Sequence, residues 1–544
     1  MMTQWLAAAG GNSPSIPAPH VEYGQLSPML VVFGAAVAGI LAEAFLPRRA
    51  RYWTQIAIAL LGLAGAFTAV IVLASQGYGS TKVDLLAMGS VALDGPALFL
   101  QGVILLVAVV AVLTYAERRL EPSIGGVPVD AFAPQAAATP GGEHERSATR
   151  AGFASTEVFP LTMFAVGGML LFPAANDLLT MFVALEVFSL PLYLLCALAR
   201  RRRLLSQEAA VKYFLLGAFA SAFFLFGTAL LYGYAGSVRL GDIADVISGE
   251  APATQALLST TQNDALLLIG LALLSVGLLF KVGAVPFHSW TPDVYQGAPT
   301  PVTGFMAAAT KVAAFGALMR LFYVAFPGLR WDWRPVMWGV AILTMVVGAV
   351  LAVTQQDVKR LLAYSSIAHA GFILTGVIAT NKQGLGAVLF YLLAYSFVTL
   401  GAFAVVTLVR DSKGEATHLS SWAGLGRRSP LLAAVFALFL LAFAGIPLTS
   451  GFTGKFAVFQ AAAAGGATPL VIVGVLSSAV AAFFYIRVIV LMFFSDPQPG
   501  GPTVAIPSAF TATAIGVGVL VTLGLGLLPQ YFLDLASKVS PFVR

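Results

Sequence analysis

Long apolar runs recur along almost the whole chain, and polar residues gather in the short stretches between them. A helix needs about 20 mostly apolar residues to cross the hydrocarbon core of a bilayer. Transmembrane strands would alternate apolar and polar residues, whereas runs such as LLLIGLALLSVGLLF do not alternate. The pattern therefore predicts fourteen membrane-spanning helices, near residues 27–46, 54–74, 94–115, 157–174, 177–199, 207–234, 264–289, 300–326, 333–353, 361–379, 384–409, 430–462, 467–494 and 508–530.

Composition supports an all-α polytopic membrane protein. Of the 544 residues, 59% are apolar and 10% are charged, with a mean hydropathy of +0.88. Soluble domains carry roughly 25% charged residues, so soluble, disordered and collagen-like classes are excluded. The single cysteine, Cys196, excludes a disulfide framework and a cysteine-ligated cluster. The first 20 residues contain no basic region, so we do not expect a cleaved signal peptide.

Basic residues in the loops predict the orientation of the chain. If the N-terminus is outside, inward loops hold 17 Lys and Arg and the outward side holds seven. Because positive residues are retained inside, we expect both termini on the outer side of the cell inner (plasma) membrane. The seven outward residues are Lys82, Arg239, Arg330, Arg334, Lys382, Lys538 and Arg544.

Six basic residues fall inside predicted helices, where an ionisable group costs at least ~2.5–3.5 kcal/mol and is functional by default. Arg320 and Arg487 lie near helix ends, and we expect them to reach the interface. A carboxylate in mid-helix and four lysines on successive helices have the composition of a proton relay. A static buried ion pair is the alternative, but one carboxylate cannot neutralise three deep lysines. These residues are Glu186, Lys212, Lys281, Lys311 and Lys455.

Two of the lysine-bearing helices, the seventh and the twelfth, are expected to be broken. Gly283 and Pro286 follow Lys281, and a run of glycine and proline precedes Lys455. Interrupted helices at corresponding positions of two halves indicate an ion site near the midplane. These two helices are five apart and run in opposite directions, which predicts two inverted five-helix repeats. The glycines and proline before Lys455 are Gly445, Pro447, Gly451 and Gly454.

This topology divides the chain into six parts. The loop of residues 116–156 is rich in Ala, Pro and Gly and shows no helical or strand period, so we expect a flexible cytoplasmic insertion. A short amphipathic piece is expected within residues 236–262. The parts are an external segment (1–26), three spans (27–115), the loop (116–156), the first repeat (157–326), the second repeat (333–494) and a last span (508–530).

Two histidines lie in or beside the spans. His288 is at the broken end of the seventh helix, and His369 is in mid-helix in LLAYSSIAHAGFIL. A supporting role in a proton path, a structural role and ligation of a haem remain open for both.

Contiguous motifs give the chain a family resemblance. The runs LLFKVGAVPFHSWTPDVYQGAPTPVTGFMAAATK (278–311) and DVKRLLAYSSIAHAGF (357–372) resemble the antiporter-like membrane subunits of respiratory complex I and of multisubunit cation/proton antiporters. Within that family, EAAVKYFLLGAFASAFFLFGTALLYG is most similar to the N-type subunit of the proton-translocating NADH–quinone oxidoreductase. Lysine at position 455 and the short stretch after the last span agree with that type.

The resemblance implies fourteen helices, two inverted repeats and a proton-translocating role without redox chemistry in this chain. It implies a Glu186–Lys281 pair, and Lys212, Lys311 and Lys455 as further relay lysines. Quinone reduction in partner subunits would supply the energy. NADH, FMN, iron–sulfur clusters and quinone would bind in those partners, and no cofactor or metal would bind here. The partners would be other membrane subunits and the bilayer, without nucleic acid. The alternatives are a cation/proton antiporter subunit and a structural scaffold.

Overall fold

The computed structural model describes residues 21–124, 127–135, 138–250, 264–411, 414–497 and 501–544. Residues 1–20, and with them most of the expected external segment, lie outside this range. Twelve helices in the described part are long and apolar enough to cross a membrane. They are α2 (Ser27–Phe45), α3 (Arg48–Ser75), α4 (Gly95–Tyr115), α7 (Leu178–Cys196), α8 (Arg203–Ala235), α11 (Asp264–Val282), the α13-to-η5 stretch (Thr300–Ala325), α15 (Arg330–Val353), α16 (Val358–Ile378), α17 (Lys382–Leu408), α21 (Thr468–Phe494) and α22 (Ala509–Leu527).

The other two expected spans correspond to shorter apolar helices. One is Val158–Ala174, which consists of α6 (Val158–Leu171) and a 3-10 turn, and the other is α19 (Pro430–Ala444), followed by α20 (Ser450–Ala464). The all-α membrane fold is therefore confirmed. The full count of fourteen and the inverted repeats stay predictions.

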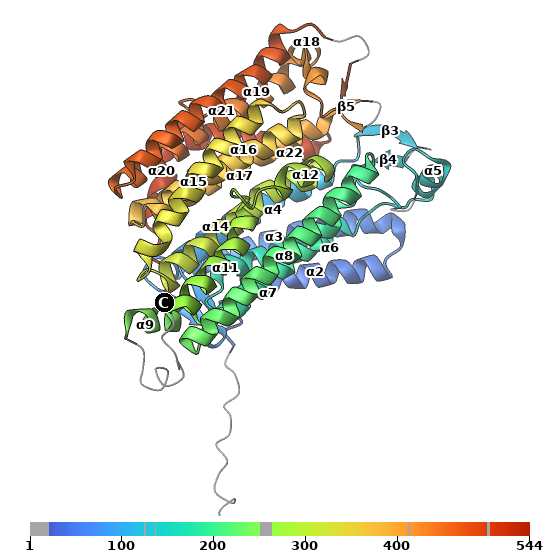
Figure 1. Ribbon diagram of the computed structural model, residues 1–544. Coiled ribbons are helices and arrows are strands. Elements are labelled where there is room, and N and C mark those ends of the chain that lie inside the picture. The colour runs from blue at the N-terminus through green and yellow to red at the C-terminus, as the bar shows by residue number, and fades with distance from the viewer. Residues whose placement is uncertain (1–20, 125–126, 136–137, 251–263, 412–413, 498–500) are drawn as a thin grey trace, which may run out of the picture.

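The long helices lie side by side in one bundle (Figure 1). One end of the bundle, which we call the hairpin end, carries β3 (Glu121–Ile124), β4 (Val127–Val129), α5 (Glu143–Arg150) and β5 (Val409–Asp411) (Figure 1). The opposite end, which we call the tail end, carries α9 (Leu240–Ser248) and the C-terminus (Figure 1). Almost all residues of the Thr300–Ala325 stretch, α16 and α17 are buried, whereas only about a third of those in α2, α3, α21 and α22 are. Helices that are apolar all round occupy the centre, so polar residues on them lie inside the protein.

Two helices break at glycines, as expected. α11 ends at Val282, Gly283 has φ +76°, and the chain resumes as α12 (Trp290–Gly297). α19 ends at Ala444, Gly445 has φ +83°, and α20 follows. A left-handed residue after the last helical turn is conformationally cheap only for glycine. Both breaks therefore follow from the sequence, and each leaves helix-terminal carbonyls inside the bundle.

The 116–156 loop has regular structure where the sequence period predicted none. β3 pairs antiparallel with β4, and α5 follows. Buried charges tie this loop to the α7–α8 connection: the Arg200 guanidinium lies 3.1 Å from Glu145 and 3.6 Å from Asp130. Ion pairs hold the segment together with a few buried apolar side chains, such as Val129 and Phe132, and these follow no regular period that the sequence could reveal.

At the same end of the bundle, two glutamates form ion pairs with basic residues and so link the two halves of the chain. Glu121 lies 2.6 Å from Arg201 and 2.9 Å from Arg410, and Glu415 lies 3.3 Å from the buried Lys359. Burial alone would raise the pKa of both carboxyls, but Arg201 beside Glu121 and Lys359 beside Glu415 outweigh it and hold each pKa below its ordinary value. β5 stands between β6 (Gly414–Glu415) and β7 (Thr503–Val504).

At the tail end, Arg320 corrects an expectation from the sequence. It does not reach the interface: both its side chain and that of Asp94 are fully buried, and its Nη2 donates to the two Asp94 carboxylate oxygens at 2.8 and 2.9 Å. Asp94 also caps α4 through the Ala97 amide and accepts the Val543 amide at 3.0 Å. One carboxylate thus holds a central helix, the start of α4 and the C-terminal segment together.

We predict that Arg320→Met destabilises the folded chain by ~3–5 kcal/mol, because it leaves the Asp94 carboxylate buried without its cation. The exposed pair Arg427–Asp496 offers a matched control, and Arg427→Gln should change stability by about 1 kcal/mol or less. Heat-induced loss of the monodisperse protein in detergent measures both. Equal shifts for the two variants would contradict the structural role given to Arg320.

A second prediction concerns pH. Since the folded-state pKa values of Glu121 and Glu415 are lowered, their stabilising contribution is present above the ordinary glutamate pKa of about 4.3 and is lost as the pH falls through the lowered values. Hydrogen exchange of β3 and β5, corrected for intrinsic rates, should accelerate in that acid range. Glu121→Gln should remove part of this pH dependence at β3; an unchanged profile would show that the carboxylate is not responsible.

Candidate functional site

Lys281, on the last turn of α11, is enclosed by aromatic rings. Its ammonium lies 5.0, 5.5 and 5.1 Å from the ring centres of Phe188, Tyr193 and Tyr213, and 3.5 Å from the Tyr213 hydroxyl. Its side chain is buried, and none of the described acidic groups lies within ion-pair distance. Ring faces attract a cation more weakly than a carboxylate at contact would. The surroundings of the buried Lys281 amine therefore stabilise its charged form only weakly.

Glu186 is half-buried on α7, and the direct pair with Lys281 that the resemblance implied is not formed. The Glu186 carboxylate instead accepts a hydrogen bond from the Ser221 hydroxyl on α8. Phe188 and Tyr193, further along α7, are the residues of that helix whose rings face the lysine. The acid and the amine thus lie on two helices that both pack against α8, without a salt bridge between them.

Lys311 lies in the centre of the bundle, at the point where π-helix η4 (Met306–Thr310) gives way to α14 (Lys311–Arg320). Its ammonium donates to the Val282 carbonyl at 3.1 Å and to the Ser366 carbonyl at 2.7 Å. Val282 is the last residue of α11, so Lys311 satisfies a carbonyl freed by the break next to Lys281. It also connects α11 to α16.

His369 lies one turn along α16 from Ser366 and has a hydroxyl at each ring nitrogen. Nδ1 is 2.7 Å from the Tyr391 hydroxyl, and Nε2 is 3.4 Å from the Tyr485 hydroxyl. Because both nitrogens are engaged, the ring is not available as a haem ligand in this arrangement. A neutral imidazole that is a donor at one nitrogen and an acceptor at the other can pass a proton between two hydroxyls.

A small cavity of about 10 Å³ lies beside His369. Tyr391 and Tyr395 line it together with Ser450, whose hydroxyl has no hydrogen-bond partner among the described residues. A volume of about 10–15 Å³ is what one water molecule requires. The space between His369 and the second helix break therefore has room for about one water, with a polar group already facing it.

Lys455 closes the row at the second break. Its ammonium donates to the Phe443 and Ala444 carbonyls at 2.8 and 3.0 Å, and to the Ser478 hydroxyl at 2.9 Å. The Phe443 ring is 5.5 Å from the His369 ring. Lys281, Lys311, His369 and Lys455 thus follow one another through shared backbone groups and ring contacts across the centre of the bundle.

Lys212 and His288 stand apart from this row. Lys212, at the hairpin end of α8, is partly exposed and pairs with Glu208 at 2.7 Å and Asp293 at 2.8 Å. Asp293, on α12, also binds Arg360 at 2.6 Å. His288 is half-buried in the segment between α11 and α12. The structure therefore brings four of the predicted residues together in one row and places Lys212 and His288 outside that row.

Sequence reasoning missed the partners of these residues. The tyrosines at His369, Ser221 at Glu186 and Asp293 at Lys212 carry no signal of their own, because each lies on another helix at an unpredicted register. Lys359, one of the 17 basic residues expected in the inward loops, is buried and donates to the Ala298 carbonyl, the C-cap of α12, at 2.6 Å. In the described residues, no three His, Cys, Asp or Glu side chains gather as metal ligands.

The model of the NADH:quinone oxidoreductase/Mrp antiporter transmembrane family matches residues 175–481, more than half of the chain. The chain belongs to this family. The resemblance inferred from the motifs is thereby confirmed at the family level, and the row of buried residues lies within the matched region.

Curated relatives cover nearly the whole chain. It is 71% identical to "NADH-quinone oxidoreductase subunit N 3" of Streptomyces griseus, over 99% of this chain and 97% of that protein. It is 60% identical to "NADH-quinone oxidoreductase subunit N" of Mycobacterium tuberculosis, over 97% of this chain and 100% of that protein. The similarity therefore includes the first three helices and the C-terminal segment, which lie outside the family match.

Solved structures of family members have the same fold. A chain of respiratory complex I from Thermus thermophilus is 35% identical, with a TM-score of 0.72 over 94% of this chain and 100% of that chain. A chain of the Mrp complex from Dietzia has a TM-score of 0.74 at 22% identity, over 94% of this chain and 96% of that one. The latter likeness shows the fold alone.

Proposed function

We propose that this chain is the N-type membrane subunit of a proton-translocating NADH–quinone oxidoreductase. The identity of 60–71% to curated subunits of that name, over nearly full length, supports the assignment. The observation that carries the mechanism is the row from Lys281 through Lys311 and His369 to Lys455. It supports proton transfer along the bundle, with Glu186, Lys212 and His288 in supporting positions.

The mechanism follows from how each amine is held. The Lys281 ammonium lies among aromatic rings, whereas those of Lys311 and Lys455 bind carbonyls. Its charged form is therefore the least stabilised of the three. Movement of Glu186 toward it would favour the charged form, and at an effective dielectric of about 20 a 4 Å charge pair is worth about 4 kcal/mol. A free energy of this size is large enough that pairing and unpairing with Glu186 can load and release the Lys281 proton.

Beyond Lys281, the proton would pass to the Lys311 amine, then to His369 and its tyrosine hydroxyls, and on to Lys455. The cavity beside His369 would take one water and shorten the step to Lys455. Electron transfer in partner subunits would drive the pairing cycle. NADH, FMN, iron–sulfur clusters and quinone would bind in those partners, with the chain in the inner (plasma) membrane and both termini outside.

A cation/proton antiporter subunit is the second candidate, because the matched family includes Mrp antiporters. The 35% identity to a chain of respiratory complex I, against 22% to the Mrp chain, favours the first. Purification of the tagged chain from its native membrane distinguishes the two. Recovery of NADH-oxidising partner subunits is expected, and recovery of antiporter subunits alone would overturn the assignment.

We predict that Lys281→Met, in assembled complex, lowers proton translocation per NADH oxidised at least about tenfold, since a positioned proton-transfer group contributes 10²–10⁴-fold. Dye-monitored acidification of inverted membrane vesicles, normalised to NADH oxidation, measures it. Lys82→Met, an exposed lysine outside the row, is the matched control and should pump normally. Normal pumping by assembled Lys281→Met would refute the relay, and loss of assembly alone would indicate a scaffold.

A further inference from the structure

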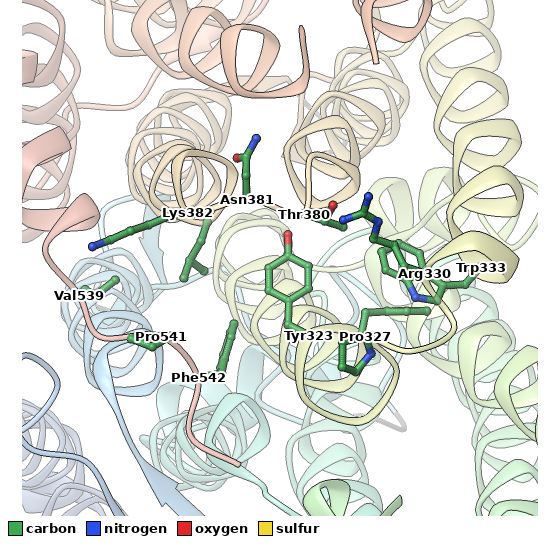
Figure 2. A pocket seen from close by; sticks show the side chains of 12 residues that line it. Tyr323, Pro327, Arg330, Trp333, Thr380, Asn381, Lys382, Val539, Pro541 and Phe542 are labelled. Atoms are coloured by element: carbon green, nitrogen blue, oxygen red, sulfur yellow. The ribbon is translucent and has the colours of Figure 1, made fainter. Parts of the chain in front are cut away.

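The tail end of the bundle contains a cavity of about 560 Å³ that the relay does not use. Its walls come from η5 (Leu321–Ala325), the start of α15, the turn between α16 and α17, and the C-terminal segment (Figure 2). Ligand sites in proteins typically measure about 300–1,000 Å³. The volume is therefore sufficient for part of an organic ligand.

Apolar and aromatic side chains form most of the lining. Phe322 and Trp333 come from the η5–α15 corner, Leu385 from α17, and Val539 and Phe542 from the C-terminal segment. The Tyr323 ring also faces the cavity, while its hydroxyl donates to the Val377 carbonyl at 2.7 Å. The polar group of this tyrosine is satisfied by the protein, so the surface offered to a ligand there is the ring.

Two cations border this apolar space. Lys382 and Arg330 lie on opposite sides of it (Figure 2). Neither forms an ion pair with an acidic group among the described residues, and none of the residues outside the described ranges is acidic. Arg330 stacks over the Trp331 ring, 5.0 Å from its centre, which leaves the guanidinium edge available for an anion.

The distribution of charge makes these cations unusual. Of the seven basic residues expected on the outward side, Arg330 and Lys382 line the cavity, and Lys538 directly precedes the C-terminal residues that line it. Two cations thus border one apolar cavity, and this combination is complementary to an anion that has an apolar part.

The position of the cavity identifies the kind of ligand. It opens where four apolar segments end or begin, at Ala325, Arg330, Ile378 and Lys382, and the exposed Trp331 lies beside it. Tryptophan and basic residues at helix ends are typical of the level of lipid headgroups. Phospholipids at that level combine acyl chains with a phosphate, which matches an apolar cavity bordered by cations.

We propose that this cavity binds an anionic phospholipid. The phosphate binds the guanidinium of Arg330, which can donate two parallel hydrogen bonds to phosphate oxygens, while Lys382 on the opposite side attracts the anionic headgroup at longer range. An acyl chain covers Phe322, Trp333 and Leu385. The lipid would then pack against the C-terminal segment, whose Val543 amide is bound to Asp94, and hold that segment on the bundle.

Photo-crosslinking in the assembled complex tests this. The complex is reconstituted in phosphatidylcholine vesicles with a minor share of phosphatidylglycerol that carries a photoreactive acyl chain, and labelled peptides are identified by mass spectrometry. We expect labelling of the peptides around Trp333 and Phe542. Because a basic residue near an anionic headgroup is worth about fivefold in occupancy, Arg330→Gln and Lys382→Gln should each lower labelling about fivefold.

Three controls decide the outcome. Lys82→Gln, an exposed cation outside the cavity, should leave labelling unchanged, and Leu385→Trp should abolish it by filling the cavity with the charges intact. Free inorganic phosphate should not compete. Equal labelling by a photoreactive phosphatidylcholine, competition by phosphate, or crosslinks between these peptides and a partner subunit in place of lipid would each overturn the proposal.

Discussion

Lysine ammonium groups that bind carbonyls at broken helix ends are the interaction on which this structure depends. Lys311 satisfies the last carbonyl of α11, Lys455 satisfies the last two of α19, and Lys359 satisfies the C-cap carbonyl of α12. In a membrane these carbonyls have no water, so each break requires an internal donor. The helix C-terminus in turn carries a partial negative charge that stabilises a cation. The lysine therefore satisfies the carbonyls that the helix break exposes, and these carbonyls stabilise the buried charge of the lysine.

The same interaction explains how charge can be both stable and movable in one bundle. Arg320 and Asp94 form a fully buried pair with full charges on both sides, and guanidinium keeps its proton under all ordinary conditions. That pair fixes helices. The relay lysines are held by carbonyl dipoles, hydroxyls and rings instead, and an amine held by dipoles can lose its proton without leaving an unpaired carboxylate behind. A charge paired with an opposite full charge thus has a structural role, whereas an amine held by dipoles, hydroxyls and rings can give up its proton.

Much of the fold could be predicted because its signals are local. The apolar runs indicated the helices, Gly283 and Gly445 indicated the breaks, and the deep lysines stood out as charges within apolar sequence. What failed depends on contacts between distant segments. Arg320 seemed interfacial because its acid lies 226 residues away. The 116–156 loop seemed structureless because ion pairs and scattered apolar contacts with other segments hold it, without a regular apolar period. No spacing in the sequence encodes either.

The candidate site divides along the same line. The sequence revealed the titratable groups but not their hydrogen-bond and ring partners. The role of each group depends on those partners. Removing Lys311 or Lys455 would leave buried carbonyls unsatisfied, at a cost of about 1–3 kcal/mol for each group, so assembly and proton transfer would fail together. Among the described residues, Lys281 donates to no carbonyl; it contacts the Tyr213 hydroxyl and faces aromatic rings. It is consequently the relay residue at which chemistry can be separated from architecture.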